Sequence, residues 1–295
     1  MPYRRFQHRW WLHILLFLLT VATTTGAGLD YYYSYVSALG TREVAVSWPL
    51  IGHATIYAVA ILAILGAHEM GHYLACRYYG VDCTLPFFIP IPSISGTAGA
   101  MIKIRESFPS RRILFDIGIA GPIAGFLVLV PVLAIAMYQS TLVHAPPPAS
   151  GTLYFGEPLL FKAMTWLKFG SVSDAYQLNL HPIGFAAWFG MLATAWNLLP
   201  FTQLDGGHLS YAALGDRSRH VSVATVTLAV AMCFVSITWI LMTLLMLAAL
   251  YFFGPHHPRP LNDDEPLDGK RYALLIFAMI MFALCFTPIP VRFEP

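Results

Sequence analysis

An apolar run over residues 49–79 carries the motif His-Glu-x-x-His at positions 68–72. The run is long enough to cross a bilayer as a helix, which needs about 20 residues. His68 and His72 are four residues apart, so on a helix they lie one turn apart on the same face. Two neutral imidazoles on one face supply half of a tetrahedral zinc site, and Glu69 lies beside them as a candidate general base. Because ionisable side chains at bilayer depth are costly, this group indicates a functional site.

The rest of the chain is also too apolar for a water-soluble fold. Of its 295 residues, 57% are hydrophobic and 11% are charged, with a mean hydropathy of +0.63. A typical soluble domain carries about 25% charged residues. We therefore expect an all-α polytopic membrane protein that contacts the lipid bilayer. A net charge of only +2, without a basic tract, argues against nucleic acid as a partner, and the four scattered cysteines favour buried thiols over a disulfide framework.

Hydropathy predicts about six membrane spans with one irregular segment between the second and the third. The predicted spans cover residues 10–27, 49–79, 113–138, 181–199, 221–253 and 272–286. The fifth is long for one crossing, so we expect it to be tilted or interrupted. Residues 28–48, which are rich in aromatic side chains, and an amphipathic piece at 158–169 are typical of the membrane interface.

The irregular segment, residues 84–104, is apolar but contains three prolines and a run of small residues. Prolines at that density prevent a straight helix. The apolar and β-branched content instead favours a re-entrant β-hairpin or loop that dips into the membrane against protein. In the third span, the glycines and alanines between Gly118 and Gly125 predict close approach of a neighbouring helix. Near its start, Arg112 and Asp116 have the spacing of an ion pair within one helix.

The distribution of cationic residues predicts an orientation. With six spans and the N-terminus inside, eleven Lys and Arg residues lie inside and six lie outside. Cytoplasmic segments carry the excess of Lys and Arg, so we expect a cytoplasmic N-terminus. The same layout places the His68 and His72 end of the second span, and the segment around Asp205, toward the cytoplasmic side. Short loops and the lack of a transit peptide favour a bacterial inner membrane over a plastid.

A catalytic zinc ion takes three protein ligands and one water, so the motif needs a third ligand at the same depth. Asp205 is the leading candidate, because Pro200 and the glycines at 206–207 break the helix and let a side chain turn inward. The alternative for this segment is a turn or a helix C-cap at the membrane edge. Asn197 is suited either to an interhelical hydrogen bond or to donation to the oxyanion of a tetrahedral intermediate. For His208 we expect an interfacial role.

At these residues the chain resembles the site-2 protease family of intramembrane zinc metalloproteases. The matching motifs are His-Glu-x-x-His at 68–72, Asn-Leu-Leu-Pro at 197–200 and Leu-Asp-Gly at 204–206. The six-span layout with an apolar hairpin also looks like that family. The small residues at 96–100 and 120–122 are similar to the branch that lacks a PDZ domain, which includes chloroplast members.

The resemblance implies a single membrane-embedded metalloprotease domain over residues 1–295, with a catalytic core at about 49–210. The longest predicted loop, 139–180, is too short for a PDZ domain. We therefore expect no PDZ or other soluble domain, so that the membrane region itself selects substrates.

The resemblance also implies the chemistry. One Zn²⁺ per chain would be held by His68, His72 and Asp205, with Glu69 as general base and Asn197 assisting the oxyanion. The substrate would be a single-span membrane protein, cut within or near its transmembrane segment for regulated proteolysis or for clearance of signal peptides and membrane proteins. The hairpin would accept the unwound substrate by strand addition.

Two other functions fit an intramembrane His, Glu and Asp cluster. A metal or ion transporter would line its route with such residues, but it should show repeated halves with matched broken helices. The sequence has no second copy of the His motif. A proteolytically inactive relative would keep the fold without the chemistry, and the intact Glu69 counts against it.

Overall fold

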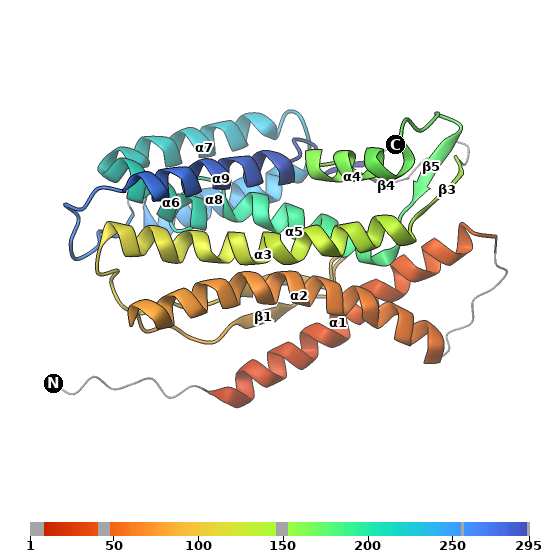
Figure 1. The fold of residues 1–295 in the computed structure, drawn as a ribbon, viewed down its shortest axis with the longest axis horizontal. Helices are drawn as coiled ribbons and strands as arrows, with labels where there is room; N and C mark the ends of the chain where they lie inside the picture. The colour runs from red at the N-terminus through yellow and green to blue at the C-terminus, as the bar shows by residue number, and fades with distance from the viewer. Residues whose placement is uncertain (1–8, 41–47, 146–152, 255–256, 294–295) are drawn as a thin grey trace.

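A computed structural model describes residues 9–40, 48–145, 153–254 and 257–293. Within these ranges the chain is mostly helical, and the long helices run roughly along the longest axis of the molecule (Figure 1). Three cationic residues used in the orientation argument, Arg4, Arg5 and Arg42, lie outside the described residues.

The first three predicted spans are confirmed as helices that are long and apolar enough to cross a membrane. They are α1 (Trp10–Ser37), α2 (Trp48–Tyr79) and α3 (Arg111–Gln139). The expected interfacial segment from residue 28 is wrong as far as Ser37, because α1 continues through it. The cause is tertiary: at Gly28 a Cβ atom would lie 2.3 Å from the carbonyl oxygen of Ala54, so α1 and α2 cross in contact there.

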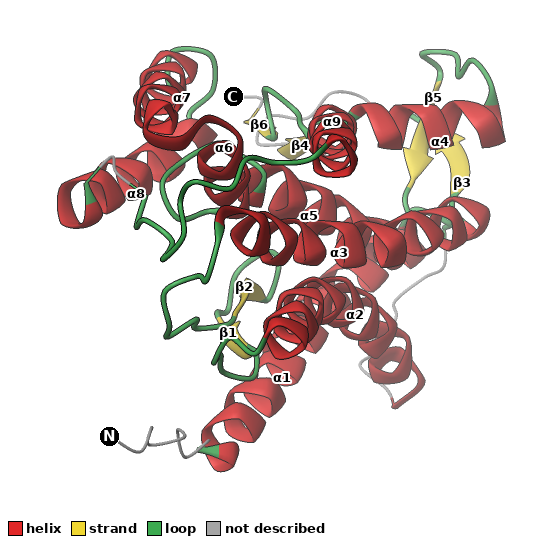
Figure 2. Cartoon of the chain, turned by 60° about the vertical axis from the view of Figure 1, so that its left-hand side comes forward, coloured by secondary structure: helices red, strands yellow, loops and turns green. Residues whose placement is uncertain are grey.

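The segment between α2 and α3 forms a β-hairpin. Strand β1 (Phe87–Pro90) pairs antiparallel with β2 (Thr97–Met101), as the proline and glycine content predicts. Figure 2 shows the hairpin lying beside α1 and α2. The His13 ring of α1 stacks on Phe87 with centroids 4.0 Å apart, and its Nδ1 lies 3.0 Å from the carbonyl oxygen of Pro86. The hairpin is therefore held on the helices rather than projecting from them.

Short elements gather where α3 ends. They are β3 (Thr141–His144), β4 (Leu153–Phe155), α4 (Leu159–Phe169), β5 (Tyr176–Asn179) and β6 (Val291–Phe293). Strand β3 pairs with β5 and β4 pairs with β6, both antiparallel. Helix α4 confirms the predicted piece at 158–169. Lys168 on α4 donates to the last carbonyl groups of α3, at 2.5 Å from Met137 and 2.7 Å from Tyr138, which satisfies acceptors that a helix end leaves open.

The second half of the chain is built from shorter helices. They are α5 (Pro182–Asn197), α6 (Asp205–Leu214), the single 3₁₀ turn η1 (Gly215–Arg217), α7 (Ser218–Met232), α8 (Thr238–Phe253) and α9 (Gly269–Cys285). The expected interruption of residues 221–253 is confirmed, because α7 ends at Met232 and α8 begins at Thr238, but the two parts do not form one span. The chain breaks between α7 and α8 and turns back, so that the two helices pack side by side (Figure 1). The Trp239 indole fixes the turn by donating to the carbonyl oxygen of Pro288 at 2.7 Å.

Because α8 turns back, residues 257–271 return to the end of the bundle where α3 begins. Arg259 lies 2.7 Å from the carboxylate of Asp216, and Arg271 donates to Asp116 at 2.9 and 2.5 Å. The expected pairing of Asp116 with Arg112 is wrong, since the ring hydroxyl of Tyr79 and the Arg271 guanidinium occupy that carboxylate. Asp116 therefore pairs with the distant Arg271 and not with Arg112 on its own helix.

We call this end, where α3, α7 and α9 begin and α2, α5 and α8 end, the basic end. Eleven of the fourteen described Lys and Arg residues belong to it: Arg9, Arg77, Lys103, Arg105, Arg111, Arg112, Arg217, Arg219, Arg259, Lys270 and Arg271. The other three described cations, Lys162, Lys168 and Arg292, lie on α4 and β6 at the opposite end. Placing Arg259, Lys270 and Arg271 opposite to Arg111 is therefore wrong, and so is placing Arg292 with it.

Candidate metal centre and active site

Three of the predicted site residues meet between α2 and α6. The Nε2 atom of His68 lies 3.1 Å from Oδ2 of Asp205, and Nε2 of His72 lies 3.2 Å from Oδ1 of the same carboxylate. The two Nε2 atoms are 3.2 Å apart. Both histidines are buried, and Asp205 is half-buried. The structure thus brings together residues that are 137 positions apart in the chain.

The donor geometry fits a small divalent cation. In a tetrahedral zinc site with bonds of about 2.0–2.1 Å, neighbouring ligand atoms are separated by about 3.3 Å, close to the separations found here. Nδ1 of His72 donates to the carbonyl oxygen of Ile117 at 2.7 Å, so a neutral His72 presents an unprotonated Nε2. That lone pair faces a carboxylate oxygen and a second imidazole nitrogen. Two histidines and one carboxylate are a catalytic zinc set, and a cation removes the repulsion between their lone pairs.

The loop between α5 and α6 places the carboxylate. Asp205 opens α6 rather than capping the end of α5, so the alternative of a C-cap is wrong. Thr202 has a φ of +35°, a left-handed conformation that a β-branched residue rarely adopts. A Cβ atom at Gly206 would lie 2.1 Å from the carbonyl oxygen of Leu198, and one at Gly207 would lie 2.2 Å from that of Thr202. The loop therefore folds against the start of α6, and only glycine fits there.

The glycines of α3 lie against the two histidines and leave room for their imidazole rings. A Cβ atom at Gly121 would lie 2.1 Å from Nε2 of His72, and one at Gly125 would lie 3.1 Å from Cβ of His68. The backbones of α2 and α3 touch nearby, where a Cβ at Gly71 would lie 2.4 Å from the carbonyl oxygen of a residue on α3. The predicted close approach is confirmed, and its consequence is that the imidazoles fit between the helices.

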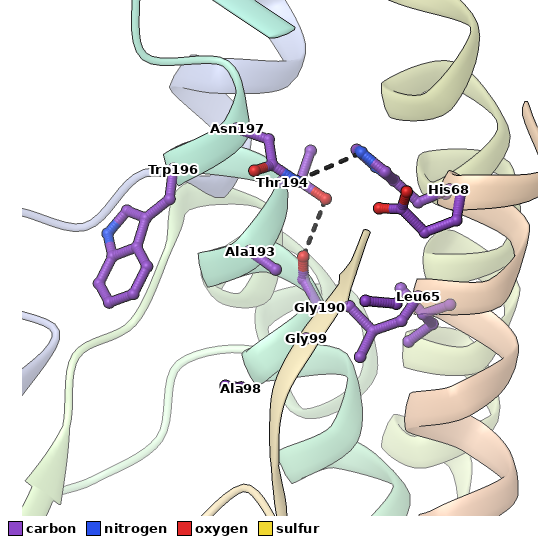
Figure 3. Close-up of a pocket in the computed structure, with 13 residues that line it drawn as sticks. Leu65, His68, Ala98, Gly99, Gly190, Ala193, Thr194, Trp196 and Asn197 are labelled. Carbon is purple, nitrogen blue, oxygen red and sulfur yellow. Dashed lines mark hydrogen bonds between the residues drawn. The ribbon is translucent and has the colours of Figure 1, made fainter. Parts of the chain in front are cut away.

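A cavity of about 130 Å³ adjoins His68 and Glu69. Its walls come from α2, α3, α5 and residues 98–100 of β2. Figure 3 shows His68 and Asn197 facing one another across it, and the Asn197 amide lies 3.2 Å from Nε2 of His68. The carboxyl group of Glu69 is buried, and the backbone amide of Ile102 faces it. A general-base candidate, a donor and one of the three cation-ligand candidates, His68, therefore border one small space.

Some contributors to the site carry no sequence signal. The carbonyl of Ile117 that orients His72 is a backbone group, and the strained φ of Thr202 becomes visible only in the fold. His208, for which we expect an interfacial role, has its Nδ1 2.6 Å from Nε2 of His257, a buried residue of the 257–268 segment. This contact ties α6, which carries Asp205, to the chain beyond α8.

Comparisons with known proteins point in one direction. The sequence model of peptidase family M50 matches residues 56–241, which include all five candidate residues. The chain is 28% identical over 307 residues to the probable zinc metalloprotease EGY1, chloroplastic, of Arabidopsis thaliana, covering 94% of this chain and 52% of that protein. The EGY1 protein of Oryza sativa subsp. japonica is 30% identical over 224 residues, covering 69% of this chain and 38% of that protein. The probable zinc metalloprotease EGY2, chloroplastic, of subsp. indica is 29% identical over 251 residues, with coverages of 81% and 43%. The chain spans about half or less of the length of these relatives.

Proposed function

The chain belongs to peptidase family M50, the site-2 proteases, and from this premise we propose that it is an intramembrane zinc endopeptidase. Its substrates are single-span membrane proteins, cut within or near the transmembrane segment. The observation that carries the proposal is the convergence of His68, His72 and Asp205, with donor atoms 3.1 to 3.2 Å apart, beside a cavity that Glu69 also borders.

The proposed mechanism gives each residue one task. When bound, zinc supplies a Lewis acid and activates water at neutral pH. His72 is held in the required tautomer by the Ile117 carbonyl. Glu69 takes the proton from the attacking water and returns it to the leaving amine, and the Ile102 amide orients its carboxylate. A metal on Nε2 of His68 would take the lone pair that Asn197 now contacts, which leaves the Asn197 amide to donate to the oxyanion.

We propose that the unwound substrate binds to the hairpin segment. The Thr84 amide donates to the Lys103 carbonyl at 3.0 Å, and the Arg105 amide donates to the Asp82 carbonyl at 3.1 Å. Backbone groups alternate in direction along a strand, so those of residues 102 and 104 point the other way. The Ile102 amide faces Glu69, which leaves the carbonyl of residue 102 and the backbone groups of residue 104 for an added strand. This unpaired edge supports strand addition. Proline at position 104 should lower cleavage, and unchanged cleavage would count against strand addition.

The proposed membrane placement follows the helices. We propose that α1, α2 and α3 cross the bilayer and that the hairpin is re-entrant. The expected six-span layout changes at one place, because the fifth span is two antiparallel helices. With 15 to 17 residues each, α5, α7, α8 and α9 are about 22–26 Å long, somewhat short of the roughly 30 Å hydrocarbon core.

The proposed orientation places the N-terminus and the basic end at the cytoplasmic face of a bacterial inner membrane. The described cations divide eleven to three between the ends, a sharper division than the six-span layout gives. The relatives are named as chloroplastic, so a plastid membrane is the alternative location. Labelling of cysteines introduced at positions 219 and 162, at opposite ends, would test the orientation.

We also propose a single catalytic domain over residues 1–295, with its core at about 49–210. The 139–180 segment is occupied by strands and α4, which supports the absence of a PDZ domain between the spans. Substrate selection would then lie in the membrane region.

A single-span reporter tests the protease function. Co-expression with wild type should produce a cleaved fragment, and Glu69→Gln should abolish it because glutamine cannot accept the proton. Zinc content of Glu69→Gln should stay near that of wild type, since Glu69 is not a proposed ligand. Glu157→Gln, at an exposed position of the opposite end, is the matched control and should cleave normally. Equal cleavage by Glu69→Gln and wild type would sink the proposal.

A further inference from the structure

A second and larger cavity, of about 980 Å³, lies at the basic end. We call it the basic cavity. Its walls continue the two segments that border the active-site cavity. Residues 98–100 line the active-site cavity and residues 101–108 line the basic cavity; on the facing side, residues 193–197 give way to residues 201–204. The unpaired edge at residues 102 and 104 runs along the same path, so an extended chain placed beside Glu69 leads into the basic cavity.

The lining of the basic cavity is partly apolar and partly cationic. Phe87, Met101 and Phe201 supply apolar surface, while Lys103 and Arg259 are exposed cations of the lining. Arg105 also lines it.

Two carboxylates reduce this positive charge. That of Glu106, which is exposed and itself lines the cavity, accepts from the backbone amide of Asp82 at 3.2 Å. Asp216 contacts Arg259 outside the lining. Lys103 is an exposed cation of this lining, four residues along the chain from Gly99 of the active-site cavity.

We propose that the basic cavity binds the flank of the substrate that lies at the basic end, an extended apolar segment with Asp or Glu within about four residues of the cleaved bond. Three to four extended residues span about 10–13 Å, the scale of one strand segment. The proposal rests on the proposed function, because it assigns the substrate class of that same site.

This lining has a consequence for selection. Ordinary single-span proteins carry Lys and Arg on their cytoplasmic flank. If the basic end is cytoplasmic, Lys103 repels that usual flank and accepts the unusual acidic one. Discrimination by like-charge repulsion needs no additional domain.

A charge-reversal experiment tests the proposal. Two single-span reporters differ only in the flank at the basic end, one carrying Asp-Asp and the other Lys-Lys, three and four residues from the cleaved bond. Purified wild type in neutral phosphatidylcholine vesicles should cleave the Asp-Asp reporter about two- to five-fold faster, the scale of one or two exposed charge pairs. Lys103→Glu should reverse the order. The preference should shrink as the salt concentration rises from roughly 0.05 to 0.5 M, because salt screens exposed charges.

The control is Lys162→Glu, an exposed cation of α4 at the opposite end, which should keep the wild-type preference. Equal cleavage of both reporters by wild type, or a Lys103→Glu variant that keeps the wild-type order, would overturn the proposal. If Lys103→Glu instead alters both reporters equally, and only in vesicles with an anionic lipid, the cation binds lipid headgroups and the proposal is also overturned. Glu69→Gln should cleave neither reporter, so failure of the flank preference is distinguishable from failure of the protease function.

Discussion

Replacing Gly121 with alanine should empty the metal centre while leaving the fold in place. The new Cβ would lie 2.1 Å from Nε2 of His72 and 2.4 Å from its Cδ2. Carbon and nitrogen atoms in contact are separated by roughly 3.5 Å, so the ring must move by more than about 1 Å. Separating the two helices to absorb this would break the close packing of α2 on α3 at Gly71.

The His72 ring therefore moves and the helix backbones stay in place. The consequences differ for stability and for metal binding. Overpacking costs about 1–3 kcal/mol, and the change from glycine to alanine inside a helix returns up to about 1 kcal/mol. The net loss of stability should be about 0–3 kcal/mol. Metal ligation tolerates distance errors of only about 0.2 Å, and losing the Ile117 hydrogen bond alone should cost about 10–100-fold in affinity.

The assay is zinc affinity in detergent, measured by competition with a chelator, together with the melting temperature of the metal-free protein. Gly125→Ala, with its nearest contact 3.1 Å from His68, should show a smaller loss of affinity. Gly52→Ala is the matched control, because a Cβ at that helical position meets no atom within 4 Å. Wild-type zinc affinity in Gly121→Ala would refute the packing argument.

Three further predictions concern the ends of the bundle. Arg271→Ala leaves the Asp116 carboxylate without its cation and should lower the free energy of unfolding by about 2–4 kcal/mol, measured by thermal unfolding. The double variant Asp116→Asn with Arg271→Gln should lose less stability, and equal losses would contradict this. Lys168→Met removes donors to the end of α3 and should cost about 1–3 kcal/mol, and an unchanged melting temperature would show that the contact contributes nothing. Burial lowers the pKa of His257 below 6.5, so the neutral imidazole contributes fully to stability above pH 6.5 and this contribution is lost as the pH falls. His257→Gln should therefore flatten the fall in melting temperature below pH 6.5. Parallel curves of melting temperature against pH for the variant and wild type would contradict this role of His257.

The convergence of His68, His72 and Asp205 is the part of this structure that the sequence predicts best. Two histidines four residues apart in an apolar helix can hardly point apart, and Asp205 follows a break that proline and glycine make visible. The hairpin at 84–104 is predictable for the same reason, since its prolines exclude a helix. In each case the informative residues are local in sequence, so local rules are sufficient.

The predictions that are wrong depend on residues far apart in the sequence. The break between α7 and α8 contains neither proline nor glycine, and Trp239 fixes it through Pro288, which lies far along the chain. Asp116 prefers the distant Arg271 to Arg112, which is one turn away, because α9 lies beside the start of α3 and the Tyr79 hydroxyl adds a further donor. Tertiary contacts override local spacing here, and they also changed which cations share an end of the bundle.

The central claim is that Asp205 completes a zinc site with His68 and His72. Zinc bound per chain, measured after dialysis of purified wild type, Asp205→Ala and the exposed control Asp264→Ala, tests it most directly. We predict about one zinc per chain in wild type and in the control, as for a site with three protein ligands, and almost none in Asp205→Ala. Zinc retained by Asp205→Ala at the wild-type level would contradict the claim.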